Sequence, residues 1–298
     1  MRSVELHQLR YVIAVAREGS FTRAAESLFL SQPSLSVQVR KLEQELGVCL
    51  FQRNGRGLVL TGAGEIFLEH AERALHEIDE AGRQIEEVKG LRRGRVSLGV
   101  LPSIGARLLP DILSAFHLRY PEIEVTLLEQ DVSGEFEQMV HAGQLDMAMI
   151  RMPRTRGDLC GRRLVREPMV ALLPPGHRLE GRSQVCLKDL ADERFVGMKA
   201  GMGLRDLMDQ VCERVGFTPQ VIVETAQLTI VRGMVRAGIG VSVLPRLAAG
   251  AESPTVRLAD DFAERRLGVV WRADQPLAPS AQAFLQLLLE SASAHSID

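Results

Sequence analysis

Apolar residues recur at regular intervals along most of this chain, and their spacing changes twice. Between residues 61 and 90 the intervals alternate between four and three, the heptad spacing of a helix that pairs with another helix. The seam consists of Phe67, Ala71, Ala74, Ile78, Ala81, Ile85 and Val88. The spacing predicts a long helix that dimerises, although a helix packed on its own domain would show the same pattern.

Beyond residue 94, short β-rich runs alternate with amphipathic helical segments, a pattern typical of an α/β domain. Strands are predicted near 95–100, 125–129, 145–151, 168–173, 194–198, 221–224, 241–244 and 267–271. Helices are predicted near 105–119, 133–142, 203–215, 226–237 and 277–292.

Two stretches of this region resemble each other, which predicts two similar half-domains. Residues 98–116 and 195–215 both have the pattern of strand, small-residue turn and helix. The start of a helix at the carboxyl end of a strand favours anions. The glycines there would equally serve to close a tight turn, so both interpretations stay open.

The first sixty residues carry the signals of two helices joined by a tight turn. Ser20 is a cap for a helix over 22–28, and Ser31 opens a longer helix from Gln32. Pro33 lies in the first turn of that helix, where its missing N–H costs little, and Gly47 ends it.

The second of these helices has a polar outer face. Leu35, Val39, Leu42 and Leu46 form its inner stripe, so Ser34, Ser36, Val37, Gln38, Arg40 and Lys41 are left outside. Small, amide and basic side chains on one face suit the major groove of DNA, although many ordinary helices have a solvated face. The next segment, 50–60, reads as a basic hairpin around Asn54-Gly55 with Arg53 and Arg56, and this combination favours duplex DNA.

Charge and composition narrow the class of protein. The net charge is −2, yet residues 1–60 hold eight basic and five acidic residues, so a nucleic-acid surface must be local. The chain shows no apolar run of signal-peptide or membrane-span length, which predicts a cytoplasmic protein without a membrane partner. Cys49, Cys160, Cys186 and Cys212 form no paired motif and the seven histidines share no ligand spacing, so no disulfide framework, metal or other cofactor is expected.

Two other classes of protein fit the sequence less well. An enzyme is not expected, because the sequence has no P-loop, no G-x-S-x-G elbow, no H-E-x-x-H helix and no G-x-G-x-x-G turn. A solute-binding protein would account for the α/β region but would leave the first sixty residues without a role.

The chain resembles the LysR-type transcriptional regulators over nearly its whole length. The resemblance is carried by 21–28 (Phe-Thr-Arg-Ala-Ala-Glu-Ser-Leu), 31–36 (Ser-Gln-Pro-Ser-Leu-Ser), 41–47 and 50–64, and further on by 108–110, 120–123, 143–146 and 235–245. It implies an α/β protein with an N-terminal all-α winged helix-turn-helix at 1–60, a linker helix at 61–90 and an effector domain at 91–298. That domain would resemble a type 2 periplasmic binding protein, with lobe I at about 91–160 plus 266–298 and lobe II at about 161–265.

The resemblance also implies partners and site residues. A homodimer or homotetramer would bind double-stranded promoter DNA, respond to a small-molecule effector and act on RNA polymerase. The implied DNA-binding residues are Arg23, Ser31, Gln32, Pro33, Ser34, Ser36, Val37, Gln38, Arg40, Arg53 and Arg56. Val37 stands where many members have Arg, which removes a guanine contact and offers a thymine methyl contact instead.

An effector cleft between the lobes is implied at Pro102, Ser103, Ile104, Ile150, Met198, Met202, Gly203, Thr225 and Gln227. Hydroxyls and free N–H groups there predict a carboxylate or other anion, and the apolar members predict a partly apolar ligand; methionines also commonly fill cores. Residues 201–212 resemble the peroxide-sensing branch, with Gly203 in place of its reactive cysteine and Cys212 at its resolving one. A thiol redox switch that uses Cys212 is therefore the alternative hypothesis.

Overall fold

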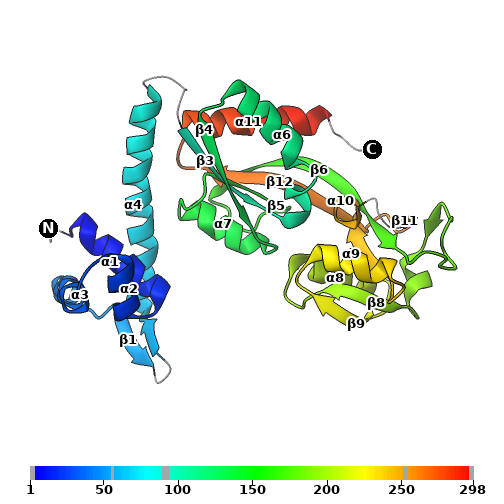
Figure 1. Ribbon diagram of the computed structural model, residues 1–298, viewed down its shortest axis with the longest axis horizontal. Helices are drawn as coiled ribbons and strands as arrows, with labels where there is room; N and C mark the ends of the chain where they lie inside the picture. The colour runs from blue at the N-terminus through cyan, green and yellow to red at the C-terminus, as the bar shows by residue number, and fades with distance from the viewer. Residues whose placement is uncertain (1–3, 55–56, 89–93, 251–253, 295–298) are drawn as a thin grey trace. The chain divides into compact units, whose positions relative to one another are not determined.

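The computed structural model describes residues 4–54, 57–88, 94–250 and 254–294. The chain divides into two compact units, which are described separately (Figure 1). Residues 1–89 make up most of the first unit, and residues 90–140 and 145–298 make up the second.

Three helices open the first unit: α1 (Leu6–Glu18), α2 (Phe21–Ser27) and α3 (Gln32–Leu46). The predicted caps are confirmed, since Ser20 Oγ accepts from Arg23 N–H at 3.4 Å and Ser31 Oγ accepts from Ser34 N–H at 3.3 Å. α3 ends at Gly47, whose φ of 75° lies in the left-handed region that glycine adopts without strain. α1 has no counterpart among the predicted elements.

The basic hairpin is confirmed as an antiparallel pair of strands, β1 (Phe51–Asn54) and β2 (Gly57–Leu60). Asn54 pairs with Gly57, so Asn54 belongs to the first strand and not to the turn expected at Asn54-Gly55. Glu43 Oε1 of α3 accepts from Leu50 N–H at 2.7 Å and thereby fixes the start of the hairpin against the helix.

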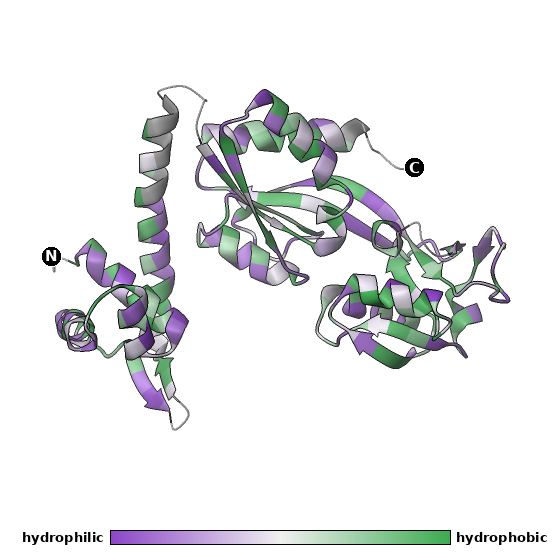
Figure 2. Cartoon of the chain, viewed as in Figure 1, coloured by the Kyte–Doolittle hydropathy of each residue, from purple (hydrophilic) through white to green (hydrophobic). Residues whose placement is uncertain are grey.

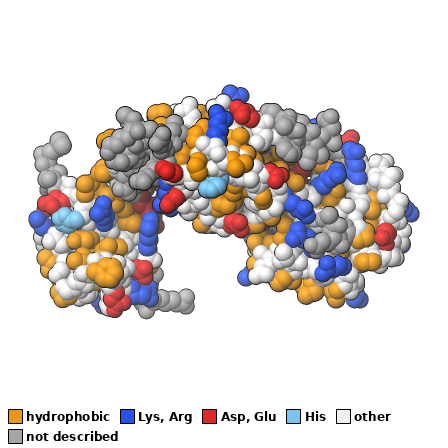
Figure 3. Space-filling model, turned by 45° about the horizontal axis from the view of Figure 1, so that its top comes forward, with side chains coloured by type: hydrophobic (Ala, Val, Ile, Leu, Met, Phe, Trp, Pro, Cys, Tyr) orange, Lys and Arg blue, Asp and Glu red, His pale blue; other side chains and the backbone are white. Residues whose placement is uncertain are grey.

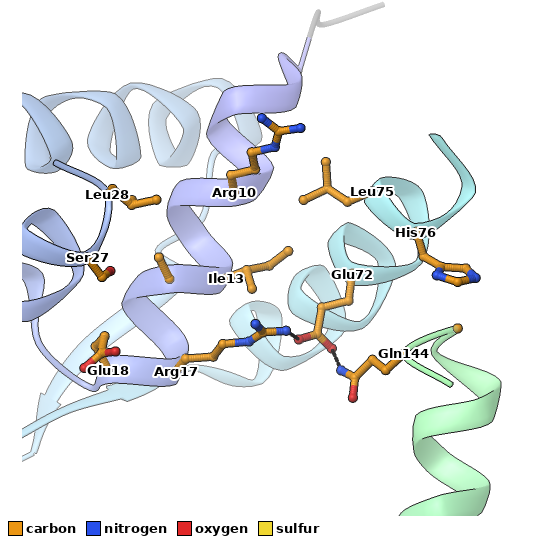
Figure 4. A pocket seen from close by; sticks show the side chains of 12 residues that line it. Arg10, Ile13, Arg17, Glu18, Ser27, Leu28, Glu72, Leu75, His76 and Gln144 are labelled. Carbon is orange, nitrogen blue, oxygen red and sulfur yellow. Dashed lines mark hydrogen bonds and ion pairs between the residues drawn. The ribbon is translucent and has the colours of Figure 1, made fainter. Parts of the chain in front are cut away.

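The predicted linker helix is α4 (Gly62–Val88), and its first half packs on α1 of the same chain. Ala71 is 2% exposed against Leu9 and Ile13, and Arg17 of α1 forms an ion pair with Glu72 at 3.5 Å (Figure 4). Phe67 and Ala74 pack on the same apolar cluster. This corrects the expectation that all seven seam positions face a second chain.

The second half of the seam is open to solvent. Ile78 and Ile85 are 45% and 63% exposed, and Ala81 is exposed as well. The side chain of Val88 lies outside the described residues. An apolar seam with these exposures is available to a second helix.

The second unit begins with lobe I, a mixed sheet in the strand order β4–β3–β5–β12–β6. β3, β4 and β5 run parallel, whereas β12 pairs antiparallel with β5 and β6. Helices α6 and α11 cover one face of this sheet and α7 the other (Figure 1), and apolar residues concentrate on its central strands (Figure 2). The elements are β3 (Gly94–Val100), α5 (Pro102–Gly105), α6 (Leu109–Arg119), β4 (Ile123–Glu129), α7 (Ser133–His141), β5 (Met147–Arg151), β6 (Leu159–Leu172), β12 (Glu264–Arg272) and α11 (Pro279–Ala294).

Lobe II is built on the second half of β6, which pairs antiparallel with β10 and β11. A parallel pair, β8 with β9, joins this sheet through a bridge between Phe195 and Val241. The elements are β7 (Gln184–Val185), a 3₁₀ turn η1 (Leu187–Leu190), β8 (Arg194–Met198), α8 (Gly203–Arg214), β9 (Gln220–Thr225), α9 (Leu228–Arg236), β10 (Ser242–Pro245), α10 (Arg246–Ala249) and β11 (Thr255–Leu258).

The structure differs from the expected elements mainly where strands pass between the lobes. The expected lobe boundaries, 160/161 and 265/266, fall inside β6 and β12, because β6 keeps its pairing with β12 as far as Pro168 opposite Glu264. The helix expected over 105–119 is α6, which begins at Leu109, and the turn that precedes it contains the short helix α5. β7, β11, α10 and the first half of β6 have no predicted counterpart.

The first turn of α4 offers a test of its close packing. A Cβ at Gly64 would overlap the carbonyl oxygen of Leu50, whereas a Cβ at Gly62 meets nothing within 4 Å. We expect Gly64→Ala to lower the free energy of unfolding of the first unit by about 1–3 kcal/mol. Gly62→Ala is the matched control, and we expect it to be neutral or stabilising by up to about 1 kcal/mol.

The measurement is urea unfolding followed by far-UV circular dichroism. Fluorescence of Trp271, the single tryptophan of the chain, follows the second unit and should keep its midpoint in both variants. Equal stability of the two variants would contradict the close packing at Gly64.

Candidate DNA interface and effector cleft

The outer face of α3 is set by what its inner face buries. Leu35, Val39 and Leu42 are all 0% exposed, so the positions between them point away from the core. Ser31, Gln32, Pro33, Ser34, Val37 and Arg40 are exposed, and Ser36 and Gln38 are half-buried. The structure therefore places the sequence-predicted residues of α3 together on one accessible face.

Hydrogen bonds order the start of this face. Ser31 Oγ and Ser34 Oγ lie 2.7 Å apart, and Gln32 Nε2 donates to Ser36 Oγ at 2.8 Å. A carboxamide that is held in this way keeps its oxygen free to accept from another donor.

A groove of about 800 Å³ separates α3 from the hairpin. Gln32, Ser36, Arg40 and the acidic Glu43 line it from the helix, and Arg53 lines it from β1. In the view of Figure 3, the surface of the first unit carries basic, acidic and apolar side chains. Such a groove, with guanidinium groups on both sides, suits a phosphate backbone.

The predicted DNA-binding arginines also include Arg23 and Arg56. Arg23 donates to the carbonyl oxygen of Glu18, and its Nε lies 3.5 Å from the Glu18 carboxylate, so its charge is already paired within the chain. Arg56 lies outside the described residues.

In the second unit, the predicted effector residues are only partly brought together. Ile104 and Ile150 are 0% exposed in the core of lobe I, and Met198 is 4% exposed in the core of lobe II. These three are core residues, which corrects their assignment to the cleft lining. Pro102, Met202 and Thr225 are half-buried, and Gln227 is exposed.

The predicted hydroxyls are engaged within the protein. Ser103 Oγ accepts from Arg265 Nη1 at 2.8 Å, and Thr225 Oγ1 accepts from Gln227 N–H at 3.2 Å. Arg265 is itself paired with Glu167, and both side chains are 1% exposed. Burial lowers the pKa of the Arg265 guanidinium, and the adjacent Glu167 carboxylate opposes this shift.

The start of α8 holds a carboxylate of the chain itself. Leu204 N–H donates to Asp131 Oδ2 at 3.0 Å, and Gly203 N–H donates to the Asp131 carbonyl oxygen at 3.0 Å. Arg151 donates to the Gly203 carbonyl oxygen. Burial raises the pKa of the Asp131 carboxyl, against the lowering effects of the Leu204 N–H and of Arg151. The N–H groups expected to be free are therefore occupied across the lobes.

Beside these contacts lies a cavity of about 290 Å³. Its lining includes the carboxylates of Glu137, Asp206 and Glu264. It also includes Ser133, Arg151, Thr155, Gln210 and Arg266, none of which the sequence analysis identified. Arg151 did carry a signal, because a charged residue directly follows the apolar run 147–150 of a buried strand. The other four residues are brought together only by the fold.

The structure disfavours a thiol switch at Cys212. Its side chain is 0% exposed, and burial raises the pKa of its thiol to about 12, with further contributions from Asp209 and Glu213. A Cβ at Gly203 would overlap the Arg151 guanidinium and the carbonyl oxygen of Asp131, so the site cannot hold a second cysteine unless both the side chain and the backbone move. A neutral, buried thiol reacts slowly with oxidants.

No cluster of three His, Cys, Asp or Glu side chains that could hold a metal ion is found among the described residues. Within the same part of the chain, no helix is both long and apolar enough to span a membrane.

A winged helix-turn-helix with a basic groove, in one chain with a two-lobed α/β domain, defines the class of DNA-binding regulators with an effector domain. Residues 6–65 match the model of the bacterial regulatory helix-turn-helix proteins of the lysR family, and residues 89–293 match the LysR substrate binding domain. The chain belongs to the LysR family of transcriptional regulators, and its second unit has the fold of periplasmic binding proteins.

Similar proteins support this assignment over the full length. The transcriptional dual regulator GltC of Bacillus subtilis is 35% identical, covering 96% of this chain and 97% of its own. The RuBisCO operon transcriptional regulator of Allochromatium vinosum is 34% identical, covering 97% of both chains. A full-length OxyR variant from Pseudomonas aeruginosa has a similar structure, with a TM-score of 0.72 at 28% identity, covering 98% of this chain and 95% of that one.

The four cysteines allow a direct test of thiol reactivity. Cys49 and Cys186 are exposed, Cys160 is half-buried and Cys212 is buried. We expect a disulfide reagent such as Ellman's to label Cys49 and Cys186 rapidly, and Cys212 only after unfolding, because its thiol stays protonated at neutral pH. Mass spectrometry of timed samples identifies each site, and early labelling of Cys212 in the folded protein would revive the redox hypothesis.

Proposed function

We propose that a small molecule with a carboxylate or another anionic group binds between the two lobes and controls the regulator. The observation that supports this proposal is the pair of contacts that Asp131 and Arg151 of lobe I make with the start of α8 in lobe II. An anion would replace the Asp131 carboxylate at the Leu204 N–H and would take Arg151 as its counter-ion. The adjoining cavity has room for the rest of a small molecule.

Binding of this kind would act on the arrangement of the lobes. A ligand that prefers one arrangement shifts the population towards it, and only by as much as its affinities for the two arrangements differ. In this proposal the shift changes how the assembled regulator bends promoter DNA and contacts RNA polymerase.

The open half of the α4 seam is the proposed dimer contact. Two chains paired there would present two winged domains to the half-sites of an interrupted palindrome, and pairs of dimers would form a tetramer. The proposed regulator works in the cytoplasm and has no catalytic activity.

The effector class is tested with matched ligands. We expect at least one small carboxylate to stabilise the purified protein against heat and to change its affinity for its own upstream intergenic DNA about fivefold or more. The uncharged amide of the same acid should do neither. Fluorescence anisotropy of labelled DNA and a thermal melt are the two readouts.

Variants of two cavity arginines separate the proposed anion site from general charge effects. Arg151→Ala should lower the affinity for the carboxylate ligand at least about tenfold, because a charge-assisted hydrogen bond is lost. Arg266→Ala is the control, since Arg266 is half-exposed and already paired with Glu264 at 2.7 Å. A response to neutral or cationic ligands alone, or an equal effect of both variants, would contradict the anion site.

The dimer contact is tested on α4. We expect Ile78→Asp combined with Ile85→Asp to convert dimers to monomers in sedimentation velocity, because carboxylates do not pack in an apolar seam. Arg73→Asp is the control, since it places the same side chain roughly 140° around the helix from Ile78. An unchanged sedimentation coefficient in the double variant would exclude this seam as the dimer contact.

A further inference from the structure

Val37 occupies the middle of the outward face of α3. At about 100° per residue, its position is opposite the stripe of Leu35, Val39 and Leu42, which is fully buried. Its side chain is 59% exposed. The most outward position of α3 is therefore a branched apolar side chain rather than a hydrogen-bonding one.

Val37 belongs to a short apolar stripe. Pro33 precedes it by four residues, which places the two side chains one above the other on the helix, and Pro33 is exposed as well. The polar pair Gln32 and Ser36 lies beside this stripe, and its members are hydrogen-bonded to each other. The helix thus presents one apolar and one polar row.

The charges around the stripe indicate what covers it. Between residues 31 and 42 the chain has two basic residues, Arg40 and Lys41, and no acidic one. Arg40 and Arg53 line the groove beside the helix together with Glu43, whose carboxylate accepts from the N–H groups of the hairpin. An apolar stripe of two side chains with cations around it matches a polyanion that exposes small apolar groups, and in the major groove that group is the C5-methyl of thymine.

We propose that Val37, with Pro33, packs on thymine methyl groups and makes an A·T pair the preferred base pair at the centre of each half-site. Readout of guanine at this position would need a donor such as Arg or Lys, and Val37 offers none. Val37 is thus a specificity-determining residue, while Arg40 and Arg53 supply affinity that does not depend on sequence. The proposal rests on DNA binding by the first unit.

The test uses full-length protein and the operator that footprinting locates in its upstream intergenic DNA. Each thymine of a half-site is replaced in turn by deoxyuridine, which removes only the C5-methyl group. We expect one or two positions at which wild-type affinity falls about fourfold, as for the loss of one buried carbon. In Val37→Ala the same deoxyuridine probe should bind as well as the thymine probe.

Three variants distinguish loss of the methyl contact from loss of the fold and from loss of charge. Val37→Ala replaces an exposed helix residue by a better helix former, so the variant keeps its fold. Val37→Thr retains a methyl group and should retain the fourfold discrimination. Arg40→Ala should weaken thymine and deoxyuridine probes equally and leave their ratio unchanged.

Two outcomes would overturn the proposal. The first is a wild-type protein that binds its operator but is insensitive to every deoxyuridine. The second is a Val37→Ala protein that keeps the wild-type ratio of affinities. Absence of operator binding by the wild type would instead count against the DNA-binding role itself.

Discussion

The buried ion pair between Glu167 and Arg265 is the constraint on which the second unit depends. The two residues are direct neighbours across β6 and β12, and each side chain is 1% exposed. Arg265 also donates to Ser103 of α5, and Glu167 accepts from the Leu247 N–H of α10 at 2.8 Å. Loss of one partner would leave an uncompensated buried charge, which costs about 3–5 kcal/mol. One pair therefore joins two strands and two helices where the chain passes between the lobes.

The two lobes are thus connected in two ways: by strands that are fixed in place, and by contacts that a ligand could replace. The strands that pass between the lobes are held by ladder hydrogen bonds and by the buried pair. The contacts of Asp131 and Arg151 with α8 lie beside a cavity, and they use backbone groups that an anion could bind equally well. Regulation by a ligand needs this combination, because a site can bias the arrangement of two lobes only if some contacts between them can exchange.

In the first unit, burial on one side of α3 determines what the other side presents. Leu35, Val39 and Leu42 fix the rotation of the helix about its axis, and the Ser31 cap fixes where it begins. Val37 is thereby held outward although water solvates it poorly. Pro33 and Val37 together form the exposed apolar stripe that the proposed thymine contact uses.

The sequence by itself determined the local elements and the family. Caps at Ser20 and Ser31, Gly47 at the helix end and the period of the inner stripe define two helices and a hairpin, because these signals act within a few residues. The same locality explains the failures: β7, β11 and the boundaries inside β6 depend on partners distant in the chain, so no nearby residue marks them. The heptad seam predicted a helix correctly, but only the fold decided that Ala71 packs on α1 while Ile78 stays open. Likewise, only tertiary structure brings Asp131, Arg151 and Gly203 together, because each lies at or beyond the end of a different strand and their meeting depends on how the two lobes close.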